Sequence, residues 1–286
     1  MTNRQKGISL IILSAFCFSL MNLFVKLAAN VPSVQKSFFR NLIALIIATF
    51  LLKKHKLSFR WRKDTFSLLF ARSAFGAIGV LCNFYAVSQI NLSDATMLNK
   101  LSPFYVILFS YLFLKEKVSF KQICYIFLAF LGSLLIIKPG FSFGTFLPSI
   151  LGFIGGICAG AAYTTVRALG LKKENSHYIV FFFSAFTCFI LLPYIIFSYA
   201  PMNGKEFFFL ILASIFGAGG QYAITAAYFY APSREISIYD YTIVIFTSIW
   251  SLLFWNDFPD VYSITGYLMI FTASALLFFY NKKIHD

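Results

Sequence analysis

The amino-acid sequence predicts an all-α polytopic membrane protein whose ten transmembrane helices form two inverted five-helix repeats. Three observations predict this fold class: the composition, the spacing of the apolar segments, and the similarity of the second half to the first. Of the 286 residues, 59% are hydrophobic and 12% are charged, whereas a soluble domain is about 45–50% apolar and about 25% charged. The composition therefore indicates a membrane protein, and ten spans leave no room for a soluble domain.

Apolar segments of about 17 to 25 residues, the length that spans a bilayer, follow one another along the chain. The expected spans are residues 8–28, 34–52, 67–88, 94–114, 119–137, 147–167, 177–198, 207–229, 236–255 and 261–280. The first segment follows Arg4 and Lys6, as the apolar region of a signal peptide would. It is too long for a signal peptide and no convincing cleavage site follows it, so we expect it to remain as the first span.

Basic residues gather in alternate connections between these segments. Residues 53–63 carry six Lys or Arg and residues 115–121 carry three, whereas the connections between them carry almost none. Because positively charged connections stay on the cytoplasmic side, we expect both termini in the cytoplasm and the chain in the cytoplasmic (inner) membrane. The net charge of +14 is then explained by anionic lipid at the cytoplasmic loops of the bilayer, and no nucleic-acid partner is needed.

Cysteine and histidine are not grouped for cross-linking or metal binding. The five cysteines lie inside apolar segments, and the three histidines are far apart. An odd, buried set of cysteines argues against a disulfide framework, and scattered ligands argue against a metal site. The chain also has no Ser/His pair and no phosphate-binding loop with its lysine. We therefore expect no metal, no cofactor and no enzymatic activity.

The sequence matches itself at a constant offset of 141 residues without a gap. The offset pairs Phe75-Gly76-Ala77 with Phe216-Gly217-Ala218 and Cys17 with Cys158. Residues 1–140 and 141–286 are therefore expected to be two repeats of five spans. Because five is odd, the second repeat is inverted relative to the first. Inverted repeats are typical of secondary transporters, although some channels also contain them, so a carrier and a pore both remain open.

Two matching stretches carry a resemblance to a known family. They are LNKLSPFYVILFSYLFLKEKVS at residues 98–119 and YDYTIVIFTSIWSLLFWNDFPD at residues 239–260. Together with the five-plus-five layout, they resemble the EamA-type domains of the drug/metabolite transporter superfamily, in which such a span ends in an acidic residue, here Glu116 and Asp257. The resemblance implies a ten-span transporter of amino acids, nucleoside derivatives, sugars or drugs. The segments SIYDYTIVIF and WNDFPD are most similar to a subset that includes S-adenosylmethionine carriers.

Polar residues at membrane depth indicate where a cavity lies, because they usually face the bundle interior. Thr96, Asn99, Lys100 and Pro103 share one helical face of the fourth segment, which Pro103 is expected to bend. The offset places Ser237, Asp240 and Tyr241 on the equivalent face of the ninth segment. The expected solute-binding residues are Asn22, Arg40, Asn83, Asn99, Lys100, Tyr163, Gln221, Tyr222, Asp240 and Tyr241.

Other residues of the spans are given structural roles. Gly76, Gly79 and their counterparts are expected to serve helix packing, with close approach of a ligand to the backbone as the alternative. The glycines of the sixth segment, Gly152, Gly156 and Gly160, are expected to serve packing alone. Lys26 and Lys36 lie near helix ends, from which they can reach the membrane interface. For Asp240, a structural ion pair with Arg72 is the alternative to a role in binding.

The charges within the spans favour a solute with an acidic group. Arg40, Arg72 and Lys100 outnumber Asp240, the one acid well inside a span. Tyrosines would suit a cation or a base. These demands predict a secondary transporter that moves a small polar metabolite, an amino acid or an amino-acid-containing nucleoside such as S-adenosylmethionine, by alternating access. The alternatives are an exporter of organic cations or drugs coupled to protons through Asp240, and a channel-type facilitator. Either a monomer or a homodimer would serve.

Overall fold

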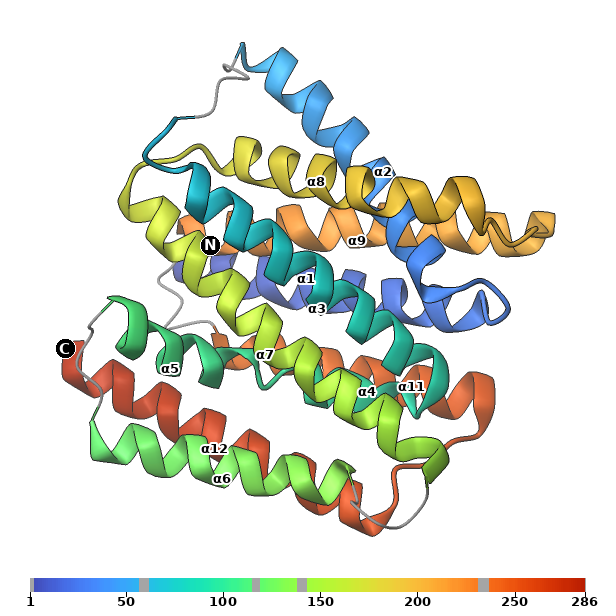
Figure 1. The fold of residues 1–286 in the computed structure, drawn as a ribbon. Coiled ribbons are helices and arrows are strands. Elements are labelled where there is room, and N and C mark those ends of the chain that lie inside the picture. Colours follow the sequence, from blue (N-terminus) through green and yellow to red (C-terminus); the bar gives the residue numbers. More distant parts are fainter. Residues whose placement is uncertain (1–2, 57–61, 115–118, 138–142, 231–236, 286) are drawn as a thin grey trace.

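A computed structural model describes residues 3–56, 62–114, 119–137, 143–230 and 237–285, and Glu116 lies outside this part of the chain. The described residues form helices and connections (Figure 1). The α-helices are α1 (Asn3–Leu27), α2 (Ser33–Lys54), α3 (Phe66–Gln89), α4 (Leu92–Asn99), α5 (Ser102–Leu114), α6 (Phe120–Ile137), α7 (Phe143–Leu171), α8 (Ser176–Phe197), α9 (Gly204–Tyr230), α11 (Thr242–Trp255) and α12 (Val261–His285), and η1 (Ser237–Tyr241) is a 3-10 helix.

Seven helices are long and apolar enough to cross a membrane. They are α1, α2, α3, α7, α8, α9 and α12. Helix α6 is shorter. The segment expected at residues 94–114 is divided into α4 and α5, and the one expected at residues 236–255 begins with the 3-10 turn η1 and continues as α11. The helix lengths thus establish a multi-pass membrane protein, whereas the count of ten spans stays a prediction.

The fourth apolar segment is broken rather than bent. Helix α4 ends at Asn99, and α5 begins at Ser102 with Pro103 in its first turn. The amide of Lys100 donates to Thr96 O at 3.0 Å and that of Leu101 donates to Leu98 O at 3.3 Å, which closes α4. Proline is tolerated in the first turn because its missing N–H has no partner there. The expectation of one bent helix is therefore wrong: the helix stops and restarts.

The other half has an irregular helix start near the equivalent place. Residues Ser237–Tyr241 form a 3-10 turn before α11 begins at Thr242. At the offset of 141, this turn corresponds to residues 96–100. The end of this turn, Tyr241, corresponds to Lys100, where α4 has ended. We call residues 100–101 and the 3-10 turn the two helix breaks.

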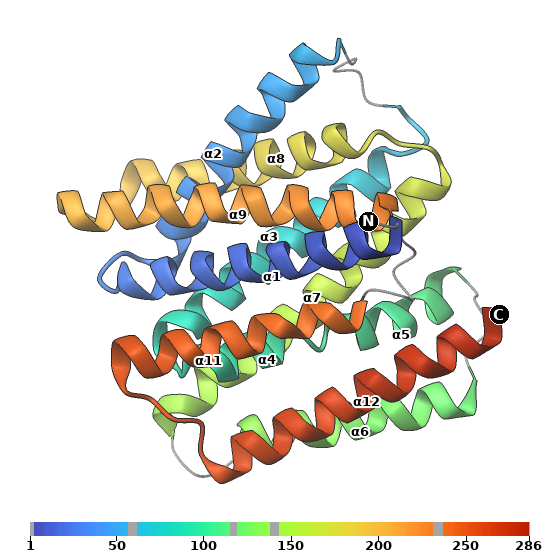
Figure 2. The same ribbon diagram turned by 180° about the vertical axis from the view of Figure 1, so that it is seen from behind.

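Helices from the two halves pack against each other in pairs. Helix α1 lies along α9, α3 along α7 and α6 along α12, whereas α2 crosses α8 (Figures 1 and 2). Each pair takes one helix from residues 1–140 and one from residues 141–286, so neither half buries its apolar faces alone. The start of α1 and the end of α12 lie at the same end of the bundle.

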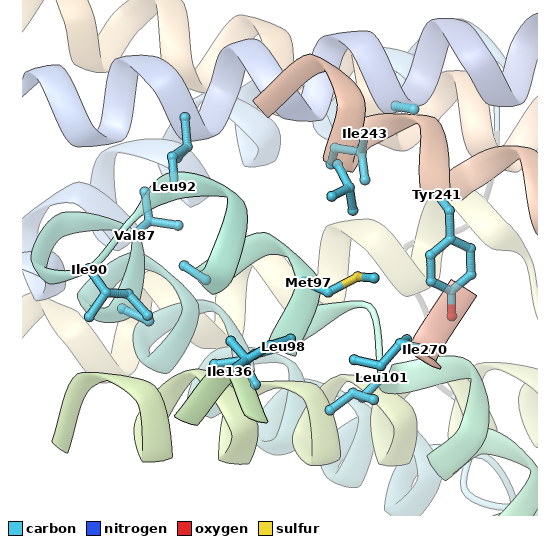
Figure 3. Close-up of a cluster of buried hydrophobic side chains, with 14 of the residues drawn as sticks. Val87, Ile90, Leu92, Met97, Leu98, Leu101, Ile136, Tyr241, Ile243 and Ile270 are labelled. Atoms are coloured by element: carbon cyan, nitrogen blue, oxygen red, sulfur yellow. The ribbon is translucent and has the colours of Figure 1, made fainter. Parts of the chain in front are cut away.

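The largest core cluster surrounds the short helix α4. Leu92, Met97 and Leu98 are buried there against Ile243 of α11 and Ile270 of α12 (Figure 3). Side chains on the outside are also apolar: Phe113 and Phe189 are 73% and 77% exposed. Such residues on the surface of a soluble protein would promote aggregation, whereas hydrocarbon accommodates them. The exposed side chains thus suit a lipid environment, and the buried cluster holds α4 at the centre of the bundle.

Candidate solute-binding site

A cavity of about 130 Å³ lies between the two halves of the chain. Seven of the ten expected binding residues line it: Asn22, Arg40, Asn83, Asn99, Lys100, Tyr163 and Gln221. Tyr222 lines a smaller space beside it, together with Arg40 and Arg72. Asp240 and Tyr241 lie behind Lys100 and are not part of the cavity wall. Most residues that the sequence pattern selected therefore lie together in the structure. Their role in binding stays a prediction.

An ion pair joins the two helix breaks. Lys100 Nζ lies 2.5 Å from Asp240 Oδ2, and the two side chains are only 12% and 13% exposed. Tyr241 supports the pair, because its hydroxyl donates to the carbonyl of Lys100 at 2.9 Å. The alternative of a structural pair between Asp240 and Arg72 is wrong: Asp240 pairs with Lys100, since the end of α4 and η1 face each other across the bundle.

Two arginines and a phenylalanine also line the cavity. Arg40 and Arg72 are 9% and 8% exposed. Their guanidinium carbons lie 5.7 and 4.0 Å from the centre of the Phe183 ring, within the range of a cation–π contact. Arg40 Nη1 donates to Asn41 Oδ1 at 3.1 Å. We call Arg40, Arg72 and Phe183 the arginine cluster.

Arg72 is not neutralised by the described residues around it. Its Nε and Nη1 atoms are buried and have no hydrogen-bond partner in the described part of the chain. The residues that line the cavity include no Asp or Glu, and Asp240, behind them, is paired with Lys100. A buried charge without a partner is costly. The arginine cluster therefore leaves positive charge facing the cavity uncompensated.

Gly76 makes room for this arrangement. A Cβ atom at Gly76 would overlap Arg72 Nη1 and would lie 2.8 Å from Cε2 of Phe183. Residue 76 is one turn beyond Arg72 on α3, so the guanidinium group lies over the bare backbone of the next turn. The expected role of Gly76 in helix packing is thus extended, because the missing side chain also positions Arg72.

Asparagine side chains form the polar wall nearer to α4. Asn22 Nδ2 donates to Thr96 Oγ1 at 3.3 Å, and Thr96 in turn donates to Leu92 O at 2.7 Å. The Oδ1 atoms of Asn22 and Asn83 are buried without a partner in the described residues. Unsatisfied groups of this kind in a cavity are suited to hydrogen-bonding a solute or water.

The end of the bundle away from both termini is closed by a polar layer. Lys26 Nζ donates to Ile90 O at 2.8 Å, lies 4.0 Å from Asp257 Oδ2, and lies 4.7 Å from the centre of the Trp255 ring. These contacts join the ends of α1, α3 and α11. Lys36 is 1% exposed and donates to Ser88 Oγ at 2.8 Å. The ammonium group of Lys36 is therefore held within the protein, next to the end of α3.

Sequence reasoning left three residues of this site out of the expected set. Arg72 could have been included, because a charge two turns into a span is itself a sign of function. Thr96 was recognised on the polar face of its segment but was not taken as a binding residue. Phe183 is one of 38 phenylalanines, and nothing in the sequence separates it from those that face lipid.

Comparisons with known proteins agree with this architecture. The EamA-like transporter family matches residues 5–138 and 147–279. The pseudopaline exporter CntI of Pseudomonas aeruginosa is 30% identical over 276 residues, which are 96% of each chain. Solute carrier family 35 member G1 of Mus musculus is 28% identical, covering 94% of this chain and 77% of its own length. A solved crystal structure at 13% identity shares the fold, with a TM-score of 0.68 and 99% of both chains covered.

The family model matches twice in succession, and a relative is aligned over nearly the whole chain, so the same assignment holds for both halves. The chain belongs to the EamA-like transporter family and is a multi-pass membrane transporter of the drug/metabolite transporter class.

Proposed function

We propose that the protein is a secondary carrier in the cytoplasmic membrane that moves a small polar metabolite by alternating access. The candidates are an amino acid and an amino-acid-containing nucleoside such as S-adenosylmethionine. The observation that carries the proposal is the polar cavity at the point where the two broken segments meet. In transporters, interrupted helices at the interface of two repeats commonly form the solute site. One chain encloses the cavity, so a monomer suffices and a homodimer is not required.

The pairing of the helices supports two inverted repeats with ten spans. At the offset of 141, α1 corresponds to α7 and α3 corresponds to α9. The pairs α1 with α9 and α7 with α3 are then equivalent, while α2 pairs with its own counterpart α8 and α6 with its counterpart α12. A two-fold axis in the membrane plane produces this pattern. It also puts both termini on one side, which the positive connections assign to the cytoplasm.

Unequal packing at the two ends supports alternating access. Helix α1 packs against α3, and α4 packs against α11. The equivalent pairs, α7 with α9 and α5 with η1, make at most marginal contact over the described residues. Within the described residues, the contact of α1 with α3 is thus more extensive than that of its equivalent pair, α7 with α9. If the two repeats exchange conformations, the cavity opens to the other side of the membrane.

The relatives support transport and differ in their solutes. One is named an exporter of pseudopaline, and another, from Brucella anthropi, is named a riboflavin transporter at 27% identity over 84% of this chain. A proton-coupled exporter of organic cations would need a carboxylate free to meet the cation. Asp240 is engaged by Lys100, so this alternative is less well supported than transport of a solute with an acidic group.

Counterflow in proteoliposomes separates a carrier from a channel. We expect a saturable flux of the transported metabolite, accelerated by unlabelled metabolite on the opposite side, when amino acids and S-adenosylmethionine are screened. Replacing Asn99 with Ala and Asp240 with Asn together should abolish it, because both changes act at the meeting point of the breaks. A linear flux without acceleration would indicate a pore, and unchanged transport by the double variant would remove the site assignment.

Cysteine labelling tests the inverted arrangement. Single cysteines at Lys56 and Met202 are introduced into a chain whose five native cysteines are replaced. The two positions follow corresponding spans, the second and the seventh, so we expect an impermeant maleimide to reach Met202→Cys from outside and Lys56→Cys only from the cytoplasm. Labelling of both cysteines from the same side would contradict two inverted repeats.

A further inference from the structure

We propose that the arginine cluster is a subsite for an anionic oxygen group, a carboxylate or a phosphate, and that the preferred solute carries net negative charge. This inference rests on the proposed function and narrows its substrate class: it favours acidic amino acids and other anionic metabolites over neutral amino acids and over S-adenosylmethionine, whose net charge is positive. We expect the anionic group of the solute to bind Arg72 and Arg40. The ring of Phe183 contacts both guanidinium groups and supports them.

The charge balance of the cavity is the first argument. Two guanidinium groups, both more than nine-tenths buried, face a cavity whose lining contains no acidic side chain. Lys100 is already matched by Asp240 at 2.5 Å. The described part of the cavity thus has an excess of about two positive charges. A zwitterion would cancel none of this excess, and an organic cation would increase it, whereas a solute with one or two negative charges would reduce it.

The second argument is the hydrogen-bonding state of Arg72. Its Nε and Nη1 atoms are buried donors without partners in the described residues. Guanidinium donors match the oxygen atoms of carboxylates and phosphates in geometry and charge, and hydrogen bonds between ions are about twice as strong as neutral ones. Because Arg72 also lines the cavity, an oxyanion bound there would bring a counter-charge to a guanidinium group whose buried donors the described residues leave unpaired.

The third argument is that the chain holds this costly arrangement in place. Phe183 lies 4.0 Å below the guanidinium carbon of Arg72, and Gly76 leaves the space into which the group extends. A long side chain at this depth is thus fixed in the cavity rather than free to move toward the membrane surface. Asn22 and Asn83, with unsatisfied Oδ1 atoms, offer neutral contacts for the remainder of the solute.

Thermal unfolding of the purified protein tests the subsite. The probes are succinate, malate, glutamate and inorganic phosphate, with succinamide and glutamine as neutral counterparts and choline as a cation. We expect at least one anion to raise the melting temperature, because it binds the folded state, while its amide counterpart does not. A rise with the carboxylates assigns the group as carboxylate, and a rise with phosphate alone assigns it as phosphate. A rise with choline or the amides only would overturn the proposal.

Variants separate binding from structure. Arg72→Gln should weaken anion binding about tenfold or more, the expected loss of a charged hydrogen bond. It should not lower the melting temperature of the empty protein, because it removes an unpaired buried charge. Arg72→Lys should bind with intermediate affinity. Arg62→Gln is the matched control, since this half-exposed arginine pairs with Asp64 in a connection far from the cavity. Undiminished anion binding by Arg72→Gln would overturn the subsite, as would lower stability of the empty variant with unchanged ligand response.

Counterflow with the same variants distinguishes this inference from the proposed function. If a neutral or cationic metabolite is exchanged equally well by the wild-type protein and by Arg72→Gln, the carrier stands and the anion subsite is wrong. If anions bind through Arg72 but no anion shows counterflow, the subsite stands and the carrier mechanism is wrong. Exchange of an anion that Arg72→Gln reduces about tenfold supports both.

Discussion

Replacing Asp240 with Asn is expected to lower the free energy of unfolding by about 3 kcal/mol, because the substitution leaves the buried ammonium group of Lys100 without its counter-charge. The pair lies between α4 and η1 at 2.5 Å with little exposure to solvent. Denaturant unfolding of the protein in detergent measures the change.

The matched control for this prediction removes both charges. The double variant Lys100→Met with Asp240→Leu should recover most of the lost stability, since replacing a buried ion pair by apolar residues of similar size is often neutral. Its transport activity should stay low, because both helix breaks lose their polar contact. Equal destabilisation by the single and the double variant would show that the ion pair contributes nothing beyond packing.

Replacing Gly156 with Ala is expected to cost about 2 kcal/mol of stability and to reduce transport about tenfold. A Cβ atom at this position would lie 2.6 Å from the carbonyl oxygen of Leu98, so α7 and the last turn of α4 would have to separate. Overpacking of this kind typically costs 1–3 kcal/mol. Asn99 and Lys100 follow directly, and both line the cavity. Thermal unfolding and counterflow measure the two effects.

Gly170 provides the control on the same helix. A Cβ atom at Gly170 meets nothing within 4 Å, so Gly170→Ala should be neutral or stabilising by up to about 1 kcal/mol through helix propensity. The sequence assigned Gly156 to packing alone, and its position against α4 links that packing to the site. If Gly156→Ala and Gly170→Ala behaved alike, the close approach of α7 to α4 would not matter for stability or transport.

The sequence predicted which segments are helical and which faces are polar, because lipid demands long apolar runs and makes polar positions conspicuous. The break at Lys100 was not predicted as a break. The polar residues before and after the break are spaced in the sequence as they would be in one continuous helix. The spacing therefore does not reveal that residues 100–101 leave the helix. Pro103 indicated only that the helix is irregular near this point.

The pairing of charges was also beyond the pattern. The offset relates Lys100 to Tyr241, and these two residues are in contact. It relates Asp240 to Asn99, however, whereas the observed ion pair of Asp240 is with Lys100. Which residue of one face meets which residue of the other depends on the relative rotation of two segments, and local periodicity does not contain that rotation. Phe183 was out of reach for the same reason, since its role follows from its place in the bundle.

The two uncompensated guanidinium groups have a consequence for the response to voltage. Moving one elementary charge through a membrane potential involves about 2.3 kcal/mol per 100 mV. Any rearrangement that carries Arg40 and Arg72 through part of the electric field therefore does electrical work in the empty protein, and a bound dianion cancels that work. The conformational change of the protein without solute should therefore depend on the membrane potential, whereas that of the protein with a bound dianion should be nearly independent of it.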